Sequence, residues 1–196
     1  EWHADKDTII AALLHDVLED TDADKASIRE HFGHNVSVLV EGVTKFTKAD
    51  FDHEASLDRK IETLRKLFEV MRQDLRVALI KLADRMHNVQ TIGALPPERA
   101  KRFAKETLDI YYKLAAHLGM RDVRQVYTEY CVPCLFGERG VQAKQIRDAL
   151  CEREKGVIST LRRNIQAEDE TGALLSVEMQ PRNLLIFHAK MEEGGE

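Results

Sequence analysis

The alternation of apolar and polar positions along the chain predicts a protein built mainly of α-helices. Apolar residues recur every three or four positions, as they do on one face of a helix. This periodicity predicts helices over about 7–19, 24–33, 35–43, 55–71, 75–91, 97–119, 121–131 and 141–167. Residues 47–53 lack the periodicity and are expected to form an exposed loop, and Gly137 and Gly140 bracket an expected break.

Residues with short polar side chains support several of these helix starts. A side-chain oxygen just before a helix can accept a hydrogen bond from the unpaired N–H groups of its first turn. We expect Asp7 or Thr8 to cap the first helix, Asp24 the second, and Asp74 the helix over 75–91.

Residues 11–21, placed on a single helix, divide into an apolar half and an ionisable half. The apolar half holds Leu13, Leu14, Val17 and Leu18. The ionisable half holds His15, Asp16, Glu19 and Asp20. An adjacent His–Asp pair offers one nitrogen and one oxygen ligand to a divalent metal, and the acidic pair one turn later can handle a water molecule. The competing interpretation is an amphipathic surface helix with an acidic face.

The helix predicted over 75–91 supplies a second polar surface. Its first two turns are almost entirely apolar, so we expect it at the centre of the core. Polar residues follow at positions i, i+3, i+4 and i+7, namely Asp84, His87, Asn88 and Thr91. A carboxylate on a core helix costs several kcal/mol unless a cation or hydrogen bonds compensate it. Asp84 is therefore a candidate partner for the ionisable half of the first helix.

Composition and charge narrow the classes of function. A net charge of −5 argues against broad binding to a phosphate backbone, so we expect no nucleic-acid binding by this domain. A small phosphorylated ligand held through a metal stays compatible with that charge. No apolar run approaches the length of a membrane span and no signal peptide opens the chain, so a cytoplasmic protein without membrane contact is expected. Composition leaves the oligomeric state open.

The cysteines do not predict a structural framework. Three cysteines are an odd number, and the Cys131–Cys134 pair has CxxC spacing without a second such pair. We therefore expect partly buried thiols and no zinc site.

Ordered motifs give the chain a family resemblance. They are His15-Asp16-Val17-Leu18-Glu19-Asp20-Thr21, Glu41-Gly42-Val43-Thr44-Lys45, Lys81-Leu82-Ala83-Asp84-Arg85-Met86-His87-Asn88 and Glu106-Thr107-Leu108-Asp109-Ile110-Tyr111. Together, over about residues 7–135, they resemble the hydrolase domain of the RelA/SpoT homologue family, the enzymes of the bacterial stringent response. The resemblance implies an all-α HD-domain phosphohydrolase bundle that binds one Mn²⁺ ion. It also implies removal of pyrophosphate from the 3′ position of guanosine tetra- or pentaphosphate, which leaves GDP or GTP.

The resemblance carries roles onto matching residues. It implies metal ligation by His15, Asp16 and Asp84, activation of the attacking water by Glu19 and Asp20, and a nucleotide pocket lined by Asn88 and Thr91. The family has a further histidine ligand well upstream of the His–Asp pair, and His3 does not match it. We therefore expect either that a preceding segment supplies this ligand or that the metal site is incomplete.

The resemblance and the helix pattern together divide the chain into three parts. We expect the hydrolase domain over 1–135, a helical connector over 136–172, and the start of a mixed α/β segment over 173–196. The last part is similar to the entrance of the family's synthetase domain. Where the family has Gly-Arg-Pro-Lys-His, this chain has Met179-Gln180-Pro181-Arg182-Asn183. We therefore expect a degenerate or truncated synthetase-like segment without synthetase activity.

Two other functions stay open at the level of sequence. The chain could be a catalytically silent module that binds nucleotide or regulates a synthetase domain. It could also be an HD phosphohydrolase that acts on another nucleotide. The intact set of costly ionisable residues favours the Mn²⁺-dependent hydrolase, whereas the missing upstream histidine favours the silent module.

Overall fold

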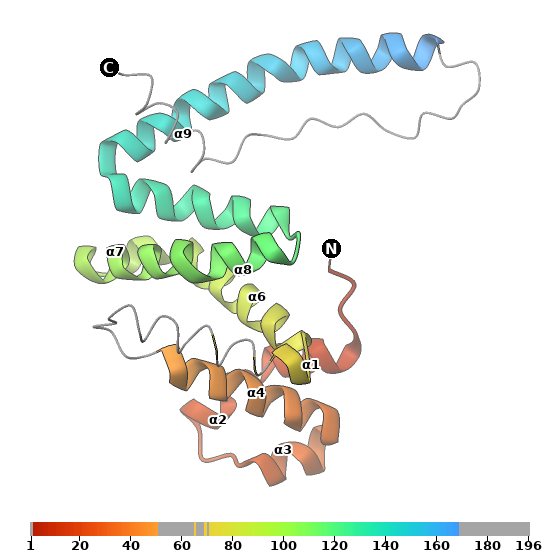
Figure 1. Cartoon of the computed structure of the whole chain (residues 1–196), viewed down its shortest axis with the longest axis vertical. Coiled ribbons are helices and arrows are strands. Elements are labelled where there is room, and N and C mark those ends of the chain that lie inside the picture. Colours follow the sequence, from red (N-terminus) through yellow and green to blue (C-terminus); the bar gives the residue numbers. More distant parts are fainter. Residues whose placement is uncertain (1, 51–64, 66–68, 70, 169–196) are drawn as a thin grey trace. The chain divides into compact units, whose positions relative to one another are not determined.

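The computed structural model describes residues 2–50, 65, 69 and 71–168, and every regular element in those ranges is helical (Figure 1). The all-α prediction is confirmed for this part of the chain. Most of the helix expected over 55–71, and the whole segment 173–196, lie outside the described residues. The chain forms two compact units, Glu1–Asn88 and Val89–Glu196. The three-part domain division stays a prediction.

The first unit is built around α4. Its elements are α1 (Lys6–Leu13), α2 (Val17–Asp20), α3 (Lys25–Phe32), α4 (His34–Asp50) and α6 (Arg76–Gln90), whose last residues belong to the second unit. Each of α1, α2 and α3 packs against α4. The core that they enclose is aliphatic and consists of Ala11, Ile28, Val36, Leu39, Val40, Val43, Val77 and Ile80. The expectation that the apolar turns of α6 are buried is confirmed.

The first helix begins with a different cap from the one expected. Asp5, rather than Asp7 or Thr8, is its N-cap, and the Thr8 backbone N–H donates to Asp5 Oδ1 over 2.7 Å. The helix therefore begins at Lys6. The cap predicted for α3 is confirmed, because the Ser27 backbone N–H donates to the carboxylate of the N-cap residue Asp24. Asp74, predicted to cap the helix over 75–91, lies two residues before α6 begins, and its carboxylate accepts from the Arg76 backbone N–H.

The helix expected to continue to about residue 19 is interrupted. The chain turns over 14–16 before α2 begins at Val17. The cause is local: Nδ1 of His15 lies 2.8 Å from the carbonyl oxygen of Ala12. In a continuous helix the Ala12 carbonyl would accept a hydrogen bond from the backbone N–H of Asp16. Here the imidazole of His15 takes the place of that backbone donor.

The interruption also corrects the predicted apolar half. Leu13 is 79% exposed. Leu14, Val17 and Leu18 are partly buried and pack against the core of the first unit, as expected. The change of direction at the turn therefore removes one leucine from the apolar face and keeps the other members on it.

The loop expected over 47–53 is wrong for its first part. Helix α4 continues through Asp50, and residues 51–53 lie outside the described residues.

In the second unit, a series of consecutive helical segments packs against one long helix. Its elements are η1 (Ile92–Ala94), α7 (Pro97–Glu106), the π-helical turn η2 (Thr107–Tyr111), α8 (Tyr112–His117) and α9 (Arg121–Glu168). The helix predicted over 97–119 is thus a continuous run that contains a π-helical turn. All three of α7, η2 and α8 pack against α9 (Figure 1).

Helix α9 bends at Gly137, where the break was predicted. Gly137 has φ 56° and ψ −132°, a backbone conformation outside the helical region that a residue with a Cβ rarely adopts. Past the bend, the backbone of Gly140 lies against Val132, and a Cβ on Gly140 would meet the Val132 carbonyl oxygen at 2.5 Å. Both glycines are therefore needed for the two halves of α9 to pack together.

Membrane crossing was not expected, and none of the helices in the described part of the chain has the length and apolar character that a bilayer span needs. The cytoplasmic location, the lack of nucleic-acid binding and the oligomeric state stay as stated from the sequence.

Candidate metal centre

The imidazole of His15 is oriented by the turn that it creates. A carbonyl oxygen can only accept, so His15 Nδ1 must be the donor in its contact with Ala12. In the neutral ring, the lone pair then lies on Nε2. An imidazole held in this way, with its other nitrogen bound to a backbone carbonyl, is the usual arrangement of a metal-ligating histidine.

Two carboxylates face that nitrogen. His15 Nε2 lies 2.9 Å from Asp16 Oδ2 and 3.5 Å from Asp84 Oδ1, so the α1–α2 turn and α6 meet at this ring. A nitrogen lone pair pointing at two carboxylates is repulsive unless a proton or a metal cation lies at Nε2. An imidazole and two carboxylates are donor types that bind divalent cations. The sequence predicted these three residues as ligands, and the structure brings them together.

The ligand arrangement is pairwise. Across the described part of the chain, no three His, Cys, Asp or Glu side chains form a group that could by itself hold a metal ion. His15 is close to each carboxylate, and the two pairs share its ring. Enclosing one ion at this place therefore requires a further ligand or a movement of these side chains.

Asp84 is held by its neighbours on α6. Lys81 Nζ lies 3.3 Å from Asp84 Oδ2, and Asn88 Nδ2 donates to Asp84 Oδ1 over 2.7 Å. The Lys81 side chain is 6% exposed and that of Asp84 is 20% exposed. Sequence reasoning missed Lys81, although an i, i+3 Lys–Asp spacing on a helix indicates such a pair. Asn88, expected to line the nucleotide pocket, is in addition a partner of the candidate ligand Asp84.

The predicted catalytic acids lie on α2. Glu19 and Asp20 are exposed, and their backbone N–H groups each donate to the Asp16 carbonyl oxygen over 2.9 Å. The short helix thus fixes both residues relative to one candidate ligand. Thr91 lies directly after α6, is exposed, and belongs to the second unit.

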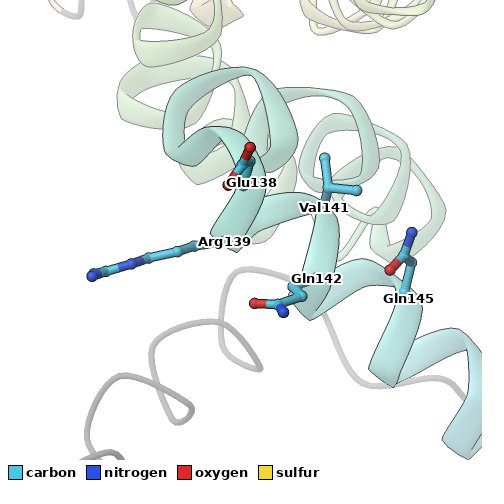
Figure 2. Close-up of a pocket in the computed structure, with 5 residues that line it drawn as sticks. All are labelled: Glu138, Arg139, Val141, Gln142 and Gln145. Carbon is cyan, nitrogen blue, oxygen red and sulfur yellow. The ribbon is translucent and has the colours of Figure 1, made fainter.

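A pocket on α9 and the three cysteines lie far in sequence from the predicted metal ligands. The pocket, of about 410 Å³, is lined by Glu138, Arg139, Val141, Gln142 and Gln145. Figure 2 shows Arg139 extending away from the other four side chains. None of the predicted site residues is among these lining residues. Cys131, Cys134 and Cys151, all of them among the described residues, form no disulfide with one another. Burial raises the pKa of the Cys134 thiol, which makes it a poorer nucleophile.

Comparison with known proteins establishes the class of protein to which this helical fold and its His–Asp pair belong. The sequence model of the HD-domain family matches residues 1–121, and the chain belongs to that family. Among curated proteins, the chain is 37% identical over 193 residues to the guanosine-3′,5′-bis(diphosphate) 3′-pyrophosphohydrolase of Vibrio cholerae. It is 37% identical over 192 residues to the bifunctional (p)ppGpp synthase/hydrolase SpoT of Escherichia coli K12. It is 34% identical over 196 residues to the GTP pyrophosphokinase rsh of Brucella melitensis.

These alignments cover nearly the whole chain but a small share of each relative. They include 98%, 97% and 100% of this chain, and 27%, 27% and 26% of the three relatives, respectively. The chain therefore spans about a quarter of the length of the curated relatives that it matches. The resemblance to the RelA/SpoT homologues is confirmed by these relatives.

Proposed function

We propose that the chain carries out Mn²⁺-dependent hydrolysis of guanosine 3′,5′-bis(diphosphate), releasing pyrophosphate from the 3′ position. The tetraphosphate would yield GDP and the pentaphosphate GTP. The observation that carries the proposal is the position of His15 Nε2 between the carboxylates of Asp16 and Asp84. The similarity to relatives named as guanosine-3′,5′-bis(diphosphate) 3′-pyrophosphohydrolases supports the choice of substrate.

In this proposal, His15, Asp16 and Asp84 hold the ion. Imidazole and carboxylate donors without thiolate suit Mn²⁺ better than structural zinc. A bound divalent ion would supply positive charge to offset that of the diphosphate and would make the attacking water easier to deprotonate. The contact of His15 with the Ala12 carbonyl keeps Nε2 aimed at the two carboxylates before the ion arrives.

The exposed acids of α2 move the proton. Glu19 or Asp20 would accept a proton from the attacking water as its oxygen bonds to the phosphorus that carries the 3′ oxygen. The bond from that phosphorus to the 3′ oxygen breaks, pyrophosphate departs, and the 3′ oxygen takes up a proton. Asn88 and Thr91 would contact the nucleotide. The Asn88 side-chain amide that would do so also donates a hydrogen bond to Asp84.

The pairwise arrangement of the ligands favours one alternative, a catalytically silent regulatory or nucleotide-binding module. Among the described residues, no three His, Cys, Asp or Glu side chains form a group that could hold a metal ion. A metal centre that had lost its function would show the same arrangement. Such a module would bind guanosine tetraphosphate without converting it.

A turnover assay separates the two functions. The protein is produced at the full length of its reading frame and incubated with Mn²⁺ and guanosine tetraphosphate, and GDP and pyrophosphate are quantified. The hydrolase predicts both products in equal amounts, and their loss in Asp84→Asn, while Asp122→Asn, an exposed carboxylate at the start of α9, retains activity. Tight nucleotide binding without products would instead establish the silent module.

A further inference from the structure

The buried lysine beside the candidate ligand Asp84 has no role in the chemistry proposed above. Lys81 lies on α6 one turn before Asp84, and its side chain is 6% exposed. Removing an ammonium group from water to this degree is costly unless a charged partner compensates it. Lys81 Nζ is 3.3 Å from Oδ2 of Asp84, so a carboxylate is among its partners.

The two oxygens of Asp84 have different surroundings. Oδ2 contacts the Lys81 ammonium. Oδ1 accepts from Asn88 over 2.7 Å and lies 3.5 Å from His15 Nε2. A carboxylate oxygen has two lone pairs, so Oδ1 keeps one for a further partner on the side of His15. The carboxylate is thereby fixed in rotation, with one oxygen given to Lys81 and the other turned towards the imidazole.

We infer that Lys81 is a positioning residue that makes Asp84 a one-oxygen ligand and so sets the ion preference of the centre. The inference rests on the proposed Mn²⁺ centre. Ca²⁺ takes six to eight oxygen ligands and commonly binds carboxylates through both oxygens, whereas smaller ions with near-octahedral geometry take one oxygen from each. With Oδ2 held by Lys81, Asp84 does not offer its second oxygen, and two-oxygen binding of Ca²⁺ by this carboxylate is disfavoured.

A lysine that acted through its charge alone would behave differently. Its removal would strengthen the attraction of Asp84 for every divalent cation by about the same factor. The ratio of the Mn²⁺ and Ca²⁺ affinities would then be unchanged. A lysine that only stabilised the fold would likewise leave this ratio unchanged in any variant that folds.

The test measures binding of Mn²⁺ alone and Ca²⁺ alone by isothermal titration calorimetry, with the full-length protein and its variants. Lys81→Met keeps the length and apolar stem of the side chain and removes the ammonium. We expect the Mn²⁺/Ca²⁺ affinity ratio to fall at least about tenfold, mainly through tighter Ca²⁺ binding, as changes around metal ligands commonly alter affinity 10- to 100-fold. Lys81→Arg, which keeps a donor and the charge, should preserve the ratio. The matched control Lys113→Met, on an exposed lysine of α8, should also preserve it.

The possible results separate this inference from the proposed function. An unchanged ratio in Lys81→Met, with Mn²⁺ still bound by the unsubstituted protein, overturns the role of Lys81 alone. If the unsubstituted protein binds neither ion, the metal centre itself is overturned. Should Lys81→Met fail to fold, a crystal structure of the unsubstituted protein with Mn²⁺ decides: Asp84 bound through Oδ1 alone supports the inference, and a ligand bound through both oxygens refutes it.

Discussion

Nδ1 of His15 and the carbonyl oxygen of Ala12 lie 2.8 Å apart, and this single contact both ends α1 and orients the candidate metal ligand. The fold and the site therefore depend on the same side chain. His15 is a structural element of the turn as well as a candidate donor to a cation.

We predict that His15→Ala abolishes stabilisation of the protein by Mn²⁺. A ligand that binds only the folded state raises its stability in proportion to the logarithm of its concentration over Kd, and the loss of Nε2 removes the donor that the two carboxylates share. Thermal unfolding followed by circular dichroism, with and without Mn²⁺, measures the effect. Helical content should not fall, because the Ala12 carbonyl becomes free to accept from the backbone.

His31→Ala is the matched control for that experiment. His31 Nδ1 lies 2.8 Å from the Ser27 carbonyl oxygen on α3, so the control removes a contact of the same kind and length. The control should keep the Mn²⁺ effect. A persistent Mn²⁺ effect in His15→Ala would contradict the assignment of His15 as a ligand.

We predict opposite effects for two Gly→Ala substitutions on α9. At Gly140, the new Cβ would lie 2.5 Å from the Val132 carbonyl oxygen and 2.9 Å from Pro133 Cα. Backbone atoms cannot move aside cheaply, so Gly140→Ala should destabilise the protein by about 1–3 kcal/mol. At Gly156, a Cβ meets nothing within 4 Å, and alanine should stabilise the helix by about 0.5–1 kcal/mol.

Chemical denaturation of both variants measures these differences in the free energy of unfolding. Equal effects at the two positions would show that the close approach of Gly140 to the other half of α9 is not maintained in solution.

The features that the sequence predicted correctly depend on periodicity and on short-range chemistry. Asp84 could be recognised because it follows two almost entirely apolar turns of its helix, and the break at Gly137 because glycine tolerates a conformation that other residues rarely adopt. The turn over 14–16 could not be found in this way. It exists because the His15 side chain competes with a backbone N–H for the Ala12 carbonyl, and periodicity does not register such competition.

The role of Lys81 was missed for a different reason. A lysine on a helix is expected to extend its charge into water, and only the 3.3 Å contact and the burial of the Lys81 side chain show that it pairs with Asp84. The spacing alone fits an exposed pair of little energetic value equally well.

We predict that Glu41 contributes to the packing of α3 on α4 through its charge. Lys25 Nζ contacts Glu41 Oε2, and Lys45 Nζ lies 3.0 Å from Oε1, so one carboxylate joins the two helices. These hydrogen bonds hold the pKa of Glu41 below its ordinary value of 4.5. Glu41→Gln should lower the free energy of unfolding by about 0.5–1 kcal/mol at pH 7, and less at high ionic strength, because salt screens partly exposed charges.

Urea titrations at low and high salt test this prediction. Glu30→Gln, an exposed carboxylate on α3, is the control and should change stability little at either salt concentration. A loss in Glu41→Gln that does not respond to salt would show that the side chain acts through packing and not through its charge.

We predict that the stability contributed by Arg76 disappears in acid. Its guanidinium contacts Asp74 and Asp5, so it links the starts of α6 and α1.

The hydrogen bond from Arg76 holds the pKa of Asp74 below its ordinary value of 3.8. The folded pKa is thus lower than the unfolded one, and the contribution is fully present above about pH 4 and is lost as the pH falls through the folded pKa. Arg76→Gln should therefore cost about 1 kcal/mol at pH 7 and almost nothing once Asp74 and Asp5 are both protonated. Thermal or urea unfolding of Arg76→Gln and of the unsubstituted protein, measured from pH 7 down to pH 2, tests whether their stabilities converge in acid. Arg72→Gln, which replaces an exposed arginine just before this helix, is the control and should show no such pH dependence. A constant difference between Arg76→Gln and the unsubstituted protein across that range would mean that Arg76 stabilises the fold by packing, because loss of the ion pair would have to follow the titration of its carboxylate.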